Sequence, residues 1–232
     1  MFYQKMYGTE KQHTPPRTMA IDSFFYVATR IRTYLSPAIK KLLPEFLAAA
    51  LRTRANQLIG SASLYMLLSD LSTIPSIKLP PGYHSASLSP GHEIDYIGVM
   101  RRSLVAAADV EWFCRTFSND PQYNPDNLLL IYEDTTPIAA AAAWQTLSEA
   151  KKTGLVHMVG VDRKYQGRGL GRVITLLVLK RLRERGFKEV MAATEDLRIP
   201  ALSLYLSLGF KPLYRHRADA WRWKKVMSRI PV

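Results

Sequence analysis

The stretch Val161–Ile174, VDRKYQGRGLGRVI, sets three glycines within five residues. The apolar run Leu155–Val161 before them predicts a buried strand, and the apolar period of Arg172–Arg185 after them predicts an amphipathic helix. The first N–H groups of such a helix have no intrahelical acceptor and lie at the positive end of its dipole. Because glycine also lets the backbone approach a ligand closely, the stretch is typical of a pyrophosphate site.

The register of the glycines separates the kinds of phosphate loop. A dinucleotide-binding loop needs Gly-x-Gly-x-x-Gly, but counting from Gly167 the sixth position is Arg172. The Gly-Lys-Ser/Thr ending of a P-loop is absent as well. The pattern that fits is Gln/Arg-x-x-Gly-x-Gly/Ala, with Gln166, Gly169 and Gly171. A tight turn without a ligand also uses glycine and stays an alternative.

A second motif follows in PALSLYLSLGF, which fits Ala-x-x-Leu-Tyr-x-x-x-Gly-Phe with Ala201, Leu204, Tyr205, Gly209 and Phe210. With both motifs in this order, the chain resembles the GNAT superfamily of N-acetyltransferases. The resemblance covers 154–215, and 83–153 is compatible with it. The stretch TEDLRIPALSLYLSLGFKP with a later tryptophan is similar, more narrowly, to the mycothiol-synthase-like branch.

The resemblance implies an α/β (α+β) fold for residues 81–232, with a mixed, mostly antiparallel twisted sheet and flanking helices. Proline-rich Ile74–Gly82 predicts a linker, and residues 1–80 are expected to form an all-helical N-terminal extension with a disordered start. Its helical pattern runs from Phe24, with a last helix over Leu64–Leu71. Strands are expected at 83–88, 128–133, 138–144, 155–161 and 190–194, helices at 92–105, 109–117, 172–185 and 200–208, and a final hairpin up to Met227.

The family's cosubstrate is acetyl-CoA, and the resemblance implies where it binds. Unpaired backbone groups of the strand before the loop would hold the pantetheine arm, and the loop would hold the pyrophosphate. The expected cofactor-binding residues are Val159, Val161, Gln166, Gly167, Arg168, Gly169, Leu170, Gly171 and Arg172.

The resemblance further implies direct attack of a primary amine on the thioester. The N–H of Val159 would polarise the carbonyl, and Tyr205 would protonate the leaving thiolate. Relatives often carry a strand Glu as base, whereas this strand has His157, whose ordinary pKa suits the task. Packing roles for Tyr205 and His157 stay open, and Glu195 or Asp196 compete for the role of base. Arg198 stands where many relatives place an Asn that helps to hold the cofactor.

The composition limits the class of protein and the compartment in which it works. The chain has 232 residues, 47% of them hydrophobic and 22% charged, which is the balance of a folded globular protein. No apolar run reaches the roughly 18 residues of a bilayer span, and we see no secretory signal. The single Cys114 allows neither an internal disulfide nor a cysteine metal cluster. We therefore expect a cytoplasmic protein that binds no metal.

The formal net charge is +13, and residues 163–188 hold nine Lys or Arg against Glu184 alone. Such a field favours a polyanionic partner, although a solvated helix face gives the same pattern. Nucleic acid is not expected, because zinc-finger spacing and an RNA-binding signature are both absent. A homodimer and a membrane contact through the N-terminal helices stay open.

Two other functions compete with transfer of an acetyl group to an amine. The fold can serve as an inactive binding or assembly module that docks through its basic N-terminal helices. A longer acyl group is the third possibility. The acceptor itself is beyond the sequence. Its site would lie near 92–117 and 211–224, where six aromatic residues are either pocket or core: Tyr96, Trp112, Phe113, Tyr214, Trp221 and Trp223.

Overall fold

The computed structural model describes residues 63–146 and 153–230. They fall into two compact units. The larger unit comprises Met66–Ala193 and Pro200–Lys211, and the described part of the smaller unit comprises residues 63–65, 194–199 and 212–230. The loop and all the expected cofactor-binding residues lie in the larger unit.

The described elements alternate between strands and helices. The strands are β1 (Ser63–Leu68), β2 (Tyr83–Ser87), β3 (Leu128–Glu133), β4 (Thr136–Gln145), β5 (Gly154–Val161), β6 (Val190–Glu195) and β7 (Lys211–Leu213). The helices are α4 (Glu93–Ser103), α5 (Val110–Phe113) with the π-helical turn η1 (Cys114–Ser118), the short turns η2 (Pro125–Asn127) and η3 (Arg163–Tyr165), α6 (Leu170–Glu184), α7 (Ile199–Ser207) and α8 (Arg217–Met227).

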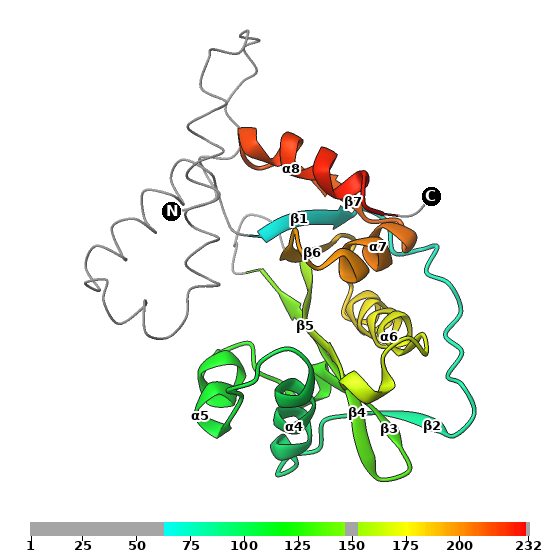
Figure 1. The fold of residues 1–232 in the computed structure, drawn as a ribbon. Helices are drawn as coiled ribbons and strands as arrows, with labels where there is room; N and C mark the ends of the chain where they lie inside the picture. Colours follow the sequence, from blue (N-terminus) through cyan, green and yellow to red (C-terminus); the bar gives the residue numbers. More distant parts are fainter. Residues whose placement is uncertain (1–62, 147–152, 231–232) are drawn as a thin grey trace, which may run out of the picture. The chain divides into compact units, whose positions relative to one another are not determined.

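The sheet of the larger unit has the strand order β2-β3-β4-β5-β6-β1. The pairs β2–β3, β3–β4 and β4–β5 are antiparallel, and β5–β6 is parallel. Helix α4 contacts one face of β4 and β5, and α6 contacts the other (Figure 1). The expected mixed fold, with a mostly antiparallel sheet and flanking helices, is thus confirmed.

Strand β5 is irregular in its middle. Ala140 pairs with Gly160 and Ala142 with His157, so β5 spends three steps where β4 spends two. The extra residue makes a β-bulge, and Met158 in it has φ 49°. Because side chains alternate between faces, one extra residue moves every later side chain of the strand to the other face.

The bulge explains the surroundings of the two strand glycines. A Cβ on Gly154 would meet Leu182 of α6, whereas a Cβ on Gly160 would meet Met100 and Ser103 of α4. In a regular strand, residues six apart face the same side, and here they face opposite sides. Met158 therefore separates the two halves of β5.

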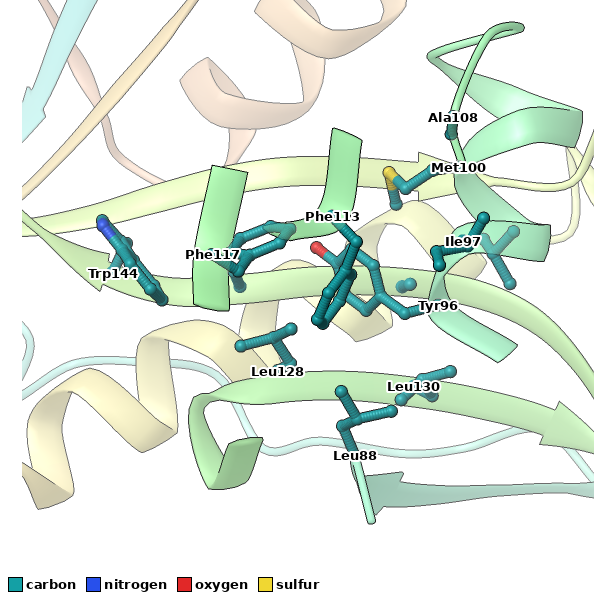
Figure 2. Close-up of a cluster of buried hydrophobic side chains, with 13 residues drawn as sticks. Leu88, Tyr96, Ile97, Met100, Ala108, Phe113, Phe117, Leu128, Leu130 and Trp144 are labelled. Atoms are coloured by element: carbon teal, nitrogen blue, oxygen red, sulfur yellow. The ribbon is translucent and has the colours of Figure 1, made fainter. Parts of the chain in front are cut away.

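The main core lies between the sheet and helices α4 and α5 (Figure 2). Tyr96, Phe113 and Phe117 meet there edge to face or tilted, with ring centroids 5.2–6.0 Å apart. The opposite wall includes Ala140 and Ala142, which belong to the fully buried run Ala139–Ala143 of β4. Because both faces of this run are covered by helices, its methyl groups fix how closely the layers approach.

Two predicted elements are wrong. Residues 63–68 form strand β1 rather than a helix over Leu64–Leu71, since the buried residues Leu64 and Met66 alternate with less buried ones. Residues 217–227 form helix α8 rather than half of a hairpin. Its buried positions follow a helical period, but two of them are the charged residues Asp219 and Arg222, which hide the apolar pattern. The other helices expected before residue 63 lie outside the described residues.

The close approach of α4 to β5 makes Gly160→Ala a test of this packing. The new methyl group would lie 2.9 Å from Met100 Cε and closer still to Ser103 Oγ, which donates to the Val99 carbonyl. We expect a loss of roughly 1–3 kcal/mol in the free energy of unfolding, measured by urea denaturation. Gly171→Ala is the control, because its Cβ would make ordinary contacts of 3.7 Å or more. Equal stability of the two variants would contradict this account.

Candidate active site

The glycine loop has the backbone that a phosphate cradle requires. Gly167 and Gly169 both have φ 78°, which only glycine adopts at low cost, and a Cβ on either would meet no atom within 4 Å. Gly169 is the residue that caps the start of α6, and the first turn of α6 contains no acidic side chain. The loop is therefore open to solvent at the positive end of a 15-residue helix.

The entry to the loop is fixed by Asp162, which is 6% exposed. Its carboxylate accepts a hydrogen bond from the Lys164 N–H at 3.0 Å and another from Arg102 Nε of α4. Burial by itself would raise the pKa of Asp162, but these hydrogen bonds and the nearby cations hold the pKa below its ordinary value. Arg102 also donates to the Pro137 carbonyl at 2.8 Å. Helix α4 and the start of β4 thus hold the start of the loop.

The polar side chains of the loop are hydrogen-bonded within the protein. Gln166 donates from Nε2 to the Val161 carbonyl at 3.0 Å. Arg168 donates to the Tyr83 hydroxyl at 3.0 Å, and its guanidinium lies 4.8 Å from the centre of the Tyr165 ring. Arg172 donates to Ser207 of α7 at 3.0 Å. The side chains of Arg163 and Lys164, at the entry to the loop, are also exposed.

The described pairing of β5 with β6 covers the first part of β5 and not the part next to the loop. The described register of β5 on β6 covers three pairs, from Gly154 with Val190 to Val156 with Ala192. Strand β5 then continues for five residues, to Val161. A Cβ on Gly171 would lie 3.9 Å from Val161 and 3.7 Å from Leu204 of α7. The second half of β5, the start of α6 and the helix that carries Tyr205 therefore meet.

His157 lies before the bulge, on the other face. Its ring centroid is 5.9 Å from that of Phe117 and 6.4 Å from that of Trp144, so it belongs to the aromatic core under α5. Burial lowers the pKa of His157 to about 4. The imidazole is therefore neutral at pH 7, but it is a weak base there.

Tyr205 is 5% exposed, and its ring packs 5.6 Å from that of Phe210. In the smaller unit, Asp196 is also buried, with its Oδ2 atom 3.7 Å from Arg222 Nε. Glu195 is half exposed and lies 3.8 Å from Arg198. Of the two competing carboxylates, Glu195 is thus the accessible one.

The aromatic candidates for an acceptor pocket divide by burial. Tyr96, Phe113 and Trp223 are core residues with 1% exposure or less, and Trp112 packs partly buried against the same core as Tyr96. Tyr214 and Trp221 are exposed. A groove of about 530 Å³ does lie in the larger unit, between α4, the β3–β4 turn and η3, with Asp95, Arg102 and Lys164 in its lining.

Sequence analysis missed three features of this region. They are the hydrogen bond from Tyr96 to the Met158 carbonyl, the hydrogen bond from Arg102 to Asp162, and the bulge at Met158. Asp162 was not singled out either, although it stands just before the loop and its residue type often caps helices. Arg102 and Met158 give no local signal, because their roles depend on contacts with elements distant in the sequence. Among the described residues, no helix is long and apolar enough to cross a bilayer, and no three potential metal ligands gather.

Curated proteins similar to this chain are named mycothiol acetyltransferases. The one from Thermomonospora curvata is 35% identical over 144 residues, which are 60% of this chain and 48% of that protein. The one from Saccharomonospora viridis is 43% identical over 149 residues, 59% of this chain and 48% of that protein. The chain thus spans about half the length of the curated relatives it matches.

Solved structures share the fold at low identity. A GCN5-related N-acetyltransferase from Sphaerobacter thermophilus superposes with a TM-score of 0.55 at 20% identity, over 72% of this chain and 53% of the other. A tandem GNAT protein from the clavulanic acid biosynthesis pathway gives a TM-score of 0.53 at 20% identity, over 71% and 55%. Residues 97–210 match the model of the acetyltransferase (GNAT) family. With both motifs and the fold in agreement, residues 97–210 of this chain are a domain of the GNAT acetyltransferase family.

Proposed function

We propose that this protein transfers an acetyl group from acetyl-CoA to a primary amine. The observation that carries the proposal is the pair Gly167 and Gly169, both at φ 78° with open space beyond them, at the start of α6. Gly186 also has a positive φ and open space, so the pair is distinguished by its place at the positive end of the 15-residue helix α6. In a GNAT domain, we infer that the anion held there is the pyrophosphate of the coenzyme.

The loop fits a pyrophosphate. The N–H groups of Gly167–Gly171 lie at a helix start, with basic residues on both sides and no acidic side chain in the first turn. We propose that Gln166, Gly167, Arg168, Gly169, Leu170, Gly171 and Arg172 hold the phosphates, and that the backbone of Val159 and Val161 holds the pantetheine arm. For Gln166, Arg168 and Arg172, contact with a phosphate means exchanging the hydrogen bonds described above.

Chemistry at the thioester needs three things from the chain. We propose that the N–H of Val159 stabilises the developing oxyanion and that the Tyr205 hydroxyl protonates the leaving thiolate. His157 stays a candidate for the base, but its low pKa matches this role poorly at neutral pH. Glu195, the half-exposed last residue of β6, is the more accessible of the two competing carboxylates.

The proposal also covers the acceptor amine, the cellular compartment and the domain boundary. The relatives are named mycothiol acetyltransferases, so a small amine chemically related to mycothiol is the first acceptor to test. We propose a cytoplasmic enzyme whose acetyltransferase domain comprises residues 81–232 together with strand β1, which precedes the proline-rich stretch 74–82. A longer acyl donor and a docking module without activity are the alternatives that the following experiments distinguish.

Gly169→Glu tests the cofactor site. The substitution places a carboxylate at the helix start and strains a backbone at φ 78°, so it should weaken acetyl-CoA binding by at least about 100-fold. Calorimetric titration with acetyl-CoA, CoA and desulfo-CoA measures the effect. Gly186→Glu is the matched control, because Gly186 has φ 84° and the same open space, but it follows the other end of α6. Retained binding in the Gly169 variant would remove the loop from the site. No binding by the native protein would favour the docking module.

Tyr205→Phe tests the acid. Removing the hydroxyl should lower kcat by roughly 100-fold while the affinity for acetyl-CoA stays within twofold, because the ring still packs on Phe210. Thiol release with an amine acceptor gives kcat, and calorimetry gives the affinity. An unchanged kcat would leave Tyr205 as a core residue only.

His157 should make stability depend on pH. Its pKa is about 4 in the folded protein and near 6.5 when unfolded, so protons bind more tightly to the unfolded chain. The contribution is fully present above pH 6.5 and is lost as the pH falls towards 4. Between pH 7 and pH 5 the native protein should lose about 2 kcal/mol more unfolding free energy than His157→Gln. Urea denaturation at both pH values measures this difference. An equal loss of unfolding free energy in the two proteins would show that His157 is not buried in this way.

A further inference from the structure

Met158 has a conformation that its surroundings must maintain. Among the described strands, it is the single non-glycine residue with a positive φ. The left-handed region is unfavourable for a side chain such as methionine, and such residues persist where neighbouring groups hold them, often next to functional sites. The question is which group of the protein holds this one.

The Tyr96 hydroxyl is the group that reaches it. Tyr96 comes from α4 and donates a hydrogen bond to the Met158 carbonyl at 3.5 Å. Its side chain is fully buried, and its ring is fixed edge to face by Phe113 at 6.0 Å and Phe117 at 5.2 Å (Figure 2). Burial raises the pKa of Tyr96 well above its usual range, so the hydroxyl remains a donor throughout the physiological range.

The geometry of the peptide unit carries this contact across the sheet. The C=O of Met158 and the N–H of Val159 belong to one planar peptide, and no described peptide is cis. In a trans peptide these two bonds point in opposite directions. A carbonyl held from the α4 side therefore requires an N–H directed away from α4, towards the face of α6 and the glycine loop.

We propose that Tyr96 is a positioning residue for acetyl transfer: its hydroxyl holds the Met158 carbonyl and thereby aims the Val159 N–H away from α4, towards the face of the sheet on which α6 and the glycine loop lie. This inference rests on the proposed function, in which that N–H stabilises the oxyanion. Tyr96 touches no reacting atom in this account. It acts through one peptide unit, and the bulge supplies the extra residue that the arrangement needs.

The test is Tyr96→Phe, which removes one oxygen atom and keeps the ring. We expect kcat to fall about tenfold while the Kd for acetyl-CoA stays within twofold, because the donor is misaimed rather than lost. The amide resonance of Val159 should shift more than those of other strand residues. Met158→Gly frees the same peptide and should give the same reduced kcat with unchanged acetyl-CoA affinity, which keeps the test valid if Tyr96→Phe fails to fold.

Tyr123→Phe is the matched control. Tyr123 stands in the same aromatic cluster, 6.2 Å from Phe113, and lies outside the contact with β5. It should change neither kcat nor the Val159 amide. A Tyr96→Phe protein with native kcat and a native Val159 resonance would overturn the proposal. If the native protein neither binds acetyl-CoA nor acetylates any amine, the proposed function fails by itself, and the Val159 resonance alone then decides the positioning role: a shift supports it, and no shift overturns it.

Discussion

Strand β5 carries one residue more than β4 between His157 and Gly160, and most of the candidate site follows from that residue. Without it, Val161 would face α4 together with His157. With it, the first half of the strand contributes His157 to the aromatic core, and the second half turns towards the start of α6. The same region of β5 lies beyond its pairing with β6. A single backbone irregularity therefore assigns one strand to two different environments.

Sequence reasoning performed well where the signal is local. The glycine pattern located the loop, and the apolar period located α6, because both depend on residues close together in the chain. The strands over 128–133 and 155–161 were predicted nearly to the residue, since apolar runs bounded by turn residues are typical of buried strands. The second motif placed α7 and its tyrosine in the same way. These features needed no knowledge of tertiary contacts.

Sequence reasoning failed where tertiary contacts decide. The run at 63–68 is too short for its apolar residues to separate a strand from a helix, and its place beside β6 settles the matter. Helix α8 has an inward-facing ion pair, Asp219 with Arg222, where a pattern search expects apolar side chains. No residue pattern marks the bulge in β5, so the sequence alone gives no signal for it. The low pKa of His157 likewise arises from burial beside rings supplied by the π-helical turn η1 and by β4, which are separate elements of the chain.

The run Ala139–Ala143 gives the domain an uneven tolerance to sequence change. These five side chains are fully buried between helices on both faces of the sheet, and none of them has chemistry to offer. A library of variants selected for folding should nevertheless be depleted most severely there, since each added methylene must displace a whole helix. The steric limits on divergence would then lie in a strand that takes no part in the reaction.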